Sequence, residues 1–144
     1  MIKTFRGKIA SAGQHKISLM GGDSDKGYRI VKLELFPTSP GTGSNEEHTV
    51  KVYKTEQSVS DNTVNFDDDT LLAAGWLPFK TSNFDTDQGI AVFDHEVVNQ
   101  DIYVTHIDTD GSLPVNYYIE LEEVTMSKGE QAVVNFSAAL LHGE

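Results

Sequence analysis

Hydrophobic and polar residues alternate along most of the chain, and Gly, Asp, Asn and Pro interrupt the alternation at short intervals. Successive side chains of a strand point to opposite faces, so this pattern is typical of antiparallel strands with one buried face. The clearest strand covers residues 28–36, where Val31, Leu33 and Leu35 are expected to share the buried face and Lys32 the other. The pattern predicts an all-β fold.

Further strands are predicted at 2–9, 16–20, 48–57, 90–98, 102–106 and 115–121. In the last two, Val104, Ile119 and Leu121 are expected to be buried. The turn residues Asp110 and Gly111 lie between these two strands and predict a hairpin, because Asp-Gly tolerates positive φ. Seven to nine short strands at regular spacing favour a mainly antiparallel β-sandwich or jelly roll.

Two segments have the features of helices. Asp69 or Thr70 is a suitable cap for a helical turn over 71–74, which Gly75 would end. After Ser127, which like Gly129 is a candidate cap, hydrophobic residues recur at helical spacing. We therefore expect one β-sandwich domain over 1–126 and a short C-terminal helical segment over 127–144.

The C-terminal segment has two possible roles. Its hydrophobic side either packs on its own sandwich or contacts a neighbouring subunit, and the sequence favours neither. In the second case, the contact residues are expected to be Val133, Phe136, Leu140 and Leu141.

Composition limits the classes of function. The 144 residues suit one domain, and 38% hydrophobic residues are enough for a core. The formal net charge of -11 argues against partners with phosphate backbones and against anionic lipid, so we expect neither nucleic-acid nor membrane binding. There is no cysteine, no apolar run of signal-peptide length at the N-terminus and no apolar stretch long enough to span a membrane.

Several acidic clusters resemble metal sites without completing one. Residues 67–69 are three consecutive aspartates, and Asp23 and Asp25 before Gly27, like Asp85 and Asp87 before Gly89, resemble the start of a calcium loop. Neither loop has the sixth-position Gly or a full ligand series. We interpret all three as solvated loops and expect no metal.

The histidines and hydroxyls form no known catalytic motif. The five histidines, at positions 15, 48, 95, 106 and 142, have no close metal-ligand spacing. His95 lies between Asp94 and Glu96 and His106 precedes Asp108, so either is a conceivable general base, although ordinary structural histidines are far more common. No serine elbow and no phosphate loop occur. We predict no catalytic residue, no cofactor and no enzymatic activity.

Six strand and turn segments carry a resemblance to a known group of proteins. They are residues 5–7, 27–32, 52–55, 71–75, 99–106 and 116–121. Together they resemble small structural proteins of marine tailed bacteriophages. The resemblance includes no chemical motif, and it assigns no catalytic or binding residue. It implies a virion component assembled in the host cytoplasm, such as a capsid decoration, vertex or fibre-associated protein, which contacts other virion proteins as a homo-oligomer.

Two hypotheses of function remain, with an enzyme a distant third. The first is a virion structural protein that acts by assembly on a capsid or tail lattice. The alternative is a carbohydrate-binding module at the virion surface that attaches to host glycans. In that case aromatic side chains would stack on sugar rings, and the candidates are Trp76, Phe79, Tyr103, Tyr117 and Tyr118.

Overall fold

The computed structural model describes residues 1–19, 25–41, 44–79, 89–127, 129–131 and 133–134. Within these residues the chain forms eight strands. They are β1 (Ile2–Ile9), β2 (Gln14–Ile17), β3 (Lys26–Pro37), β4 (Glu46–Tyr53), β5 (Leu71–Phe79), β6 (Ile90–Phe93), β7 (Ile102–Asp108) and β8 (Val115–Thr125).

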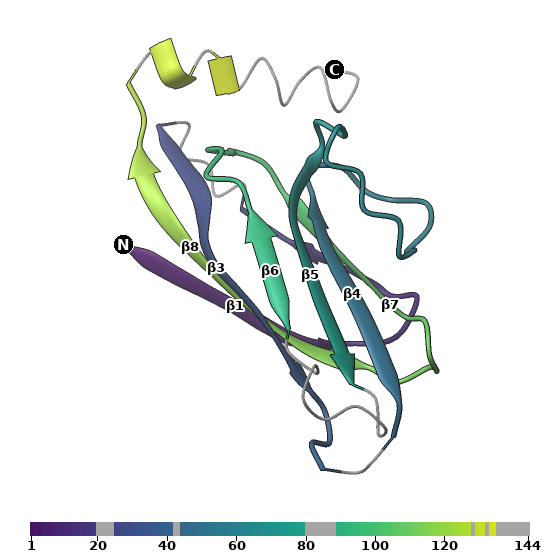
Figure 1. Cartoon of the computed structure of the whole chain (residues 1–144). Coiled ribbons are helices and arrows are strands. Elements are labelled where there is room, and N and C mark those ends of the chain that lie inside the picture. The colour runs from purple at the N-terminus through teal and green to yellow at the C-terminus, as the bar shows by residue number, and fades with distance from the viewer. Residues whose placement is uncertain (20–24, 42–43, 80–88, 128, 132, 135–144) are drawn as a thin grey trace.

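The strands form two antiparallel sheets that pack face to face (Figure 1). One sheet has three strands in the order β1-β8-β3, and the other has five in the order β2-β7-β4-β5-β6. This arrangement confirms the predicted all-β, sandwich-like fold. The first two strands lie at sheet edges, because β1 borders one sheet and β2 borders the other.

The hydrophobic core fills the space between the two sheets. Leu33, Val104, Ile119 and Leu121, which the alternation predicts to be buried, all belong to it. The buried hydrophobic residues of this cluster are Ile9, Ile17, Leu19, Tyr28, Ile30, Leu33, Val50, Val52, Leu72, Ala73, Val98, Ile102, Val104, Val115, Tyr117, Ile119 and Leu121.

The prediction that Val31 lies in the core is wrong. A β-bulge between Ile30 and Lys32 shifts the pairing of β3 with β8, so Ile30 pairs with Leu121 and takes the buried position. Val31 is the extra residue of the bulge and is only half-buried. Leu35 is also half-buried, although it still packs against the core.

The predicted hairpin between the last two strands is also wrong. β7 belongs to the five-stranded sheet and β8 to the three-stranded sheet, so residues 109–114 cross from one layer to the other. The strands pair with other partners, β7 with β2 and β4, and β8 with β1 and β3. A turn sequence allows the chain to reverse, but the position of the partner strands decides where it goes.

The predicted helical turn over 71–74 is a strand instead. β5 pairs with β4 on one side and with β6 on the other, and these ladders outweigh the helix propensity of Leu and Ala. Gly75 lies within β5, where an added Cβ would come within 3.2 Å of the Leu35 side chain. The glycine therefore permits close packing between the sheets and ends no helix.

The C-terminal segment begins a helix, as predicted. Residues 129–131 and 133–134 are helical and lie over one end of the sandwich (Figure 1). The Ser127 hydroxyl accepts a hydrogen bond from the Glu130 N–H at 3.3 Å, which confirms Ser127 as the cap. Val133 is 67% exposed. The other predicted contact residues, Phe136, Leu140 and Leu141, lie outside the described residues.

Candidate functional site

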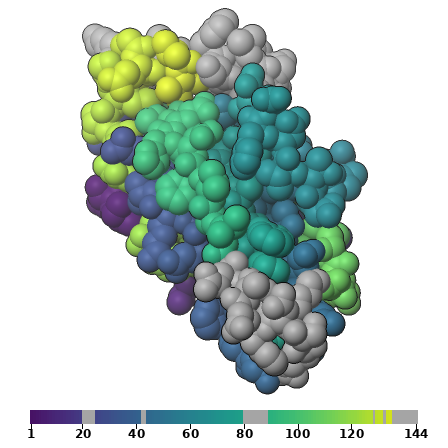
Figure 2. All heavy atoms as spheres, viewed as in Figure 1, coloured from purple at the N-terminus to yellow at the C-terminus, as the bar shows by residue number. Residues whose placement is uncertain are grey.

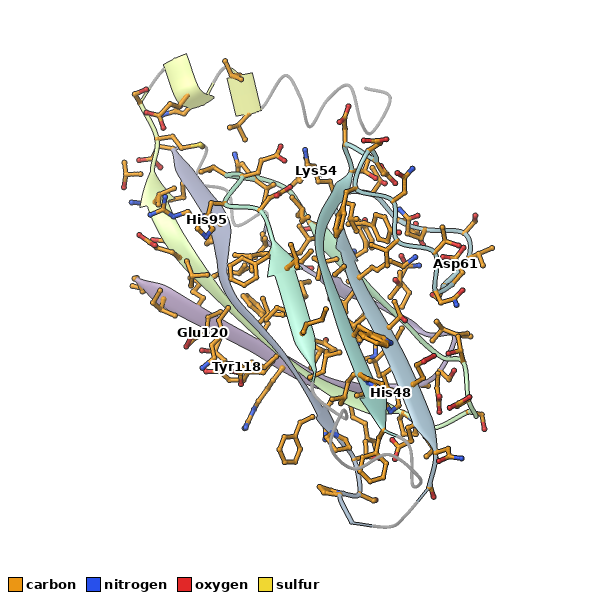
Figure 3. The ribbon with its side chains drawn as sticks, viewed as in Figure 1. His48, Lys54, Asp61, His95, Tyr118 and Glu120 are labelled. Carbon is orange, nitrogen blue, oxygen red and sulfur yellow. The ribbon has the colours of Figure 1, made fainter. Side chains whose placement is uncertain are left out.

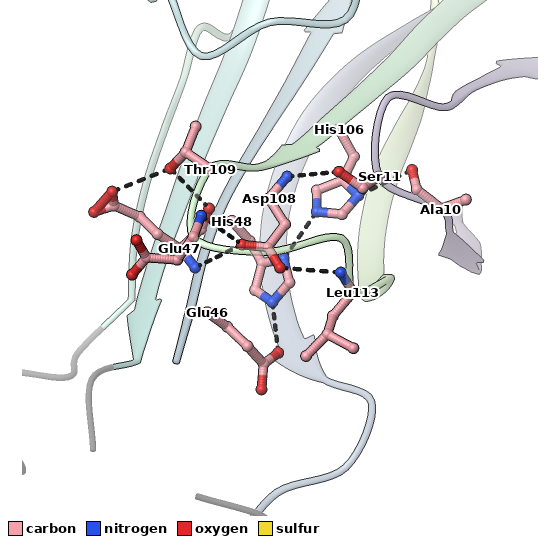
Figure 4. Close-up of polar contacts among 10 residues, drawn as sticks. Ala10, Ser11, Glu46, Glu47, His48, His106, Asp108, Thr109 and Leu113 are labelled. Carbon is pink, nitrogen blue, oxygen red and sulfur yellow. Dashed lines mark hydrogen bonds and ion pairs between the residues drawn. The ribbon is translucent and has the colours of Figure 1, made fainter. Parts of the chain in front are cut away.

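A buried polar network occupies one end of the sandwich (Figure 4). Glu46 and His48 lie on β4, and His106 and Asp108 lie on the neighbouring strand β7. All four are at most 3% exposed. They continue the inward faces of their strands beyond the core residues Val50, Val52, Ile102 and Val104, so the interior changes from hydrophobic to polar along the same period-two rows.

Three of these residues form one continuous chain of hydrogen bonds. Glu46 Oε1 lies 2.7 Å from His48 Nε2, and His48 Nδ1 lies 2.8 Å from His106 Nε2. His106 Nδ1 lies 3.1 Å from the carbonyl oxygen of Ala10. The two imidazole rings are tilted by 35° with their centroids 5.0 Å apart.

The carbonyl at the end of this chain fixes the direction of the hydrogen bond that it forms with His106. A carbonyl only accepts, so His106 must donate from Nδ1, and in its neutral form it accepts at Nε2. With His106 neutral, His48 donates from Nδ1 to His106, and the contact between Glu46 and His48 extends the buried chain of hydrogen bonds.

Asp108 organises the loop beside this network. Its Oδ1 accepts hydrogen bonds from the N–H groups of Glu47 at 3.0 Å and Asp110 at 3.1 Å, and its Oδ2 accepts one from Leu113 at 3.0 Å. Its own N–H donates to the Ser11 hydroxyl at 3.0 Å. A carboxylate that accepts three backbone hydrogen bonds fixes the crossing between the sheets.

His106 does not fit the role of a general base. Burial lowers its pKa, and so does the nearby His48, while the Ala10 carbonyl and Asp108 oppose this change. Both of its ring nitrogens are engaged within the protein, and its direct partner is His48 and not the Asp108 carboxylate. A general base must reach the proton that it removes from a substrate. The geometry instead suits a tie between β4, β7 and the connection after β1.

His95, the other candidate base, is exposed on the segment after β6 (Figure 3). No described residue hydrogen-bonds to its ring, which contacts Phe93 at a centroid distance of 5.8 Å. The adjacent Glu96 pairs with Lys54. The sequence neighbours of His95 therefore do not orient it as a base.

The aspartates at 67–69 stabilise a turn before β5. Asp68 Oδ1 accepts hydrogen bonds from the Thr70 N–H at 2.9 Å and from the Thr70 hydroxyl at 2.7 Å. Among the described residues, no group of three or more acidic or histidine side chains is placed to hold a metal ion. Asp23, Asp85 and Asp87 lie outside the described residues.

The aromatic candidates for sugar binding are dispersed over the fold. Tyr117 is 6% exposed and packs inside against Gly7, where an added Cβ would lie 3.0 Å from the Tyr117 hydroxyl. Tyr103 and Phe79 are half-buried. Trp76 and Tyr118 lie on opposite outer faces of the sandwich, since β5 and β8 belong to different sheets.

Trp76 belongs to an exposed hydrophobic surface on β5 and β6. It pairs directly with Ile90, and Val92 follows on the same face of β6. These three side chains, here called the β5–β6 patch, are 43%, 59% and 52% exposed respectively. β6 lies on the face of the molecule turned to the viewer in Figure 2. Hydrophobic spacing alone does not reveal this patch, because it depends on the pairing of β6 with β5.

Tyr118 belongs to a hollow on the outer face of the other sheet. This β1–β8–β3 hollow has a volume of about 620 Å³, and its outward side chains are Arg6, Lys8, Glu34, Phe36, Asn116 and Tyr118. Tyr118 points away from the sandwich interior (Figure 3). Alternation along each strand places the other members on outer faces, but only the pairing of β1 and β3 with β8 brings them together.

Comparisons with known proteins add no family to this picture. No family model matches the sequence, and no curated protein matches it. Within the described residues, no helix has the length and hydrophobicity needed to cross a membrane.

Proposed function

We propose that this chain is a non-enzymatic structural protein that associates with further copies of itself through the β5–β6 patch, as a component of a bacteriophage virion. The observation that carries the proposal is the exposed, uncharged strand β6 at the edge of the five-stranded sheet. The resemblance to phage structural proteins supports the virion as the place of assembly. Exposed Val133 adds a second hydrophobic contact in the C-terminal segment.

Edge strands usually carry features that prevent unwanted pairing. Charged side chains, prolines and bulges serve this purpose, because the free N–H and C=O groups of an edge can pair with a strand of another chain. The β6 sequence Ile-Ala-Val-Phe has none of them. Within the described part of the chain β6 pairs with β5 alone. An edge of this kind, beside exposed Trp76, suits strand pairing between subunits.

The net charge controls when this association occurs. Copies that each carry a formal charge of -11 repel one another, which keeps free subunits apart at low salt. Salt screens that repulsion but leaves hydrophobic contact intact. Association through the β5–β6 patch should therefore strengthen as the salt concentration rises.

A pair of matched variants tests the proposal. Ile90→Lys places a charge on β6, and Ile2→Lys places one on β1, the edge of the other sheet, where Ile2 is 51% exposed. Light scattering should give a multiple of the 15.8 kDa subunit mass for the intact chain and for Ile2→Lys, and the monomer mass for Ile90→Lys. Co-sedimentation with particles of a phage that encodes the chain should follow the same order. An intact chain that stays monomeric and never sediments with particles would overturn the proposal.

Carbohydrate binding is the second candidate function, and a separate observation favours it. The β1–β8–β3 hollow combines two aromatic rings with hydrogen-bonding and charged side chains on the face opposite the β5–β6 patch. Its volume of about 620 Å³ falls within the range of small-molecule sites. A glycan array compares this candidate with assembly, because assembly through β6 predicts no glycan binding.

A further inference from the structure

The register of the three-stranded sheet brings the hollow together from three strands. Arg6 of β1 pairs with Tyr118 of β8, and Tyr118 pairs with Glu34 of β3. In the next outward row, Lys8 pairs with Asn116 and Asn116 pairs with Phe36. The two aromatic side chains therefore lie in adjacent rows, with the two cations along one side on β1.

The two cations of the hollow differ from the other charges on this face. Lys32 pairs with Glu34 at 3.5 Å and lies 5.7 Å from the centre of the Tyr118 ring, and Arg29 binds Glu122 at 3.1 Å. Arg6 and Lys8 are exposed, and no described residue forms an ion pair or hydrogen bond with either side chain. In a protein with a net charge of -11, the hollow thus presents two cations without an ion-pair partner among the described residues, and the nearby Glu120 carboxylate accepts from the Tyr118 hydroxyl at 3.3 Å.

The aromatic side chains define the shape of the ligand. Phe36 is 62% exposed, an unusual state for a phenylalanine on the open face of a sheet, and Tyr118 is half-buried beside it. Aromatic faces attract flat apolar surfaces such as the C–H face of a pyranose ring. Asn116 lies on the central strand between Lys8 and Phe36, and no described residue hydrogen-bonds to its amide, which leaves it able to bind a hydroxyl group.

We propose that the β1–β8–β3 hollow binds carboxylated sugars of an acidic polysaccharide. Phe36 and Tyr118 stack on sugar rings, Arg6 holds a carboxylate through its planar guanidinium, and Asn116 binds a hydroxyl. Arg6 and Lys8 are two residues apart on β1, or about 7 Å, so they can meet charges on successive sugars. This inference rests on the second candidate function, carbohydrate binding, and not on assembly through β6.

The chemistry favours an acidic sugar over other anions. Nucleic acid carries a denser charge, and two cations cannot offset its repulsion by the remaining acidic surface. A neutral sugar would stack on the aromatic rings but would form no ion pair with Arg6 or Lys8. A uronic acid uses both features at once, because it has an apolar ring face and one carboxylate per sugar.

The test uses the full-length protein and polymers of defined charge. Isothermal calorimetry should detect binding of polygalacturonate or alginate, weaker binding of the neutral glucan laminarin, and weakening of polyuronate binding by salt. Arg6→Gln should weaken polyuronate binding about tenfold and leave laminarin binding unchanged. Phe36→Ala should weaken binding of both. Both side chains are exposed, so these variants should keep their circular dichroism spectra.

A matched control distinguishes specific binding in the hollow from non-specific attraction between charges. Lys16→Gln removes the same charge from β2 on the other sheet, where the Lys16 side chain is 55% exposed, and it should leave polyuronate binding intact. Equal weakening by Lys16→Gln and Arg6→Gln, together with equal binding of dextran sulfate, would overturn the proposal. Binding that depends on Phe36 but not on Arg6 would reject the acidic class and keep carbohydrate binding. If none of the polymers binds, both the acidic-sugar proposal and carbohydrate binding by this hollow are rejected.

Discussion

The central strands of the two sheets, β8 and β4, differ in how the protein covers their outer faces. Burial along β8 alternates, since its inward residues from Val115 to Leu121 are buried and those between them are half-exposed. In β4, seven of the eight residues are buried, whichever face of the sheet their side chains point to, and only Glu47 is half-exposed. Burial therefore alternates along a strand that has one solvent-exposed face. It does not alternate along a strand whose two faces are both covered.

The segment after β4 covers the outer face of that strand. The Lys51 side chain is 2% exposed, and its ammonium group donates to Asp61 Oδ1 at 2.7 Å and to the Thr63 carbonyl at 2.6 Å. Gln57 exchanges hydrogen bonds with Gln14 of β2, and Ser60 donates to the Gly13 carbonyl. The five-stranded sheet therefore buries polar residues that, Thr105 excepted, have hydrogen-bond partners, whereas the three-stranded sheet relies on hydrophobic contact.

The largest expected effect comes from placing a charge in the hydrophobic layer. Leu33→Asp buries an unpaired carboxylate at a position that is 4% exposed, which costs several kcal/mol against a typical total stability of about 5–15 kcal/mol. We expect the domain to unfold, as measured by loss of its β circular dichroism signal. Glu34→Gln, one residue away on the exposed face, should fold normally. A folded Leu33→Asp protein would mean that the two sheets can separate locally.

A smaller but still large effect should follow from breaking the polar network. His48→Leu keeps the volume but removes the partner of Glu46 and of His106 Nε2. Loss of one partner of a buried pair costs about 3–5 kcal/mol, because the other group stays in the interior without compensation. Urea denaturation should show this loss for His48→Leu and almost none for His95→Leu at an exposed site. Equal stability of the two variants would show that the network is hydrated.

The same contrast explains which parts of the fold the sequence predicted. Where one face is wet, as in β8, alternation identified both the strand and its buried residues. On β4 and β7 the strands were predicted, but Lys51, His48 and His106 resembled surface residues because polarity alone does not reveal a covering segment. The bulge at Val31 has no signal in the sequence, since a hydrophobic residue followed by a lysine fits either register.

The candidate sites were harder to predict because they depend on register between distant strands. Arg6, Asn116 and Phe36 meet only because β1 and β3 pair with opposite sides of β8. Likewise His48 meets His106 because β4 lies beside β7. The spacing of residues predicts the face of the strand on which each one lies, but it does not predict which strands are neighbours in the sheet.

Acid should weaken the polar end of the sandwich before the hydrophobic layer. Burial lowers the pKa of His106 from its usual value of 6.5, with His48 adding to the effect and with the Ala10 carbonyl and Asp108 opposing it. The unfolded chain then binds a proton that the folded chain resists. Stability is therefore fully present above pH 6.5 and falls below it, by up to about 1.4 kcal/mol for each pH unit.

Denaturation curves between pH 7.5 and about 5 test this dependence. His106→Asn removes the titrating ring, so its stability should change less with pH than that of the intact protein. His95→Gln removes an exposed ring and should keep the original dependence. A His106→Asn protein with the original slope would assign the acid sensitivity to other groups.

The smallest expected effect has the opposite sign, because it corrects a defect in the polar layer. Thr105 on β7 is 0% exposed, and its hydroxyl is, within the described residues, the one buried side-chain polar atom without a hydrogen-bond partner. Thr105→Val replaces that hydroxyl by a methyl group of similar size, which should stabilise the protein by about 1 kcal/mol. Thr70→Val makes the same change where the hydroxyl donates to Asp68, and it should destabilise by a similar amount. Thermal denaturation of both variants measures the two signs, and a loss of stability in Thr105→Val would mean that a water molecule satisfies the Thr105 hydroxyl.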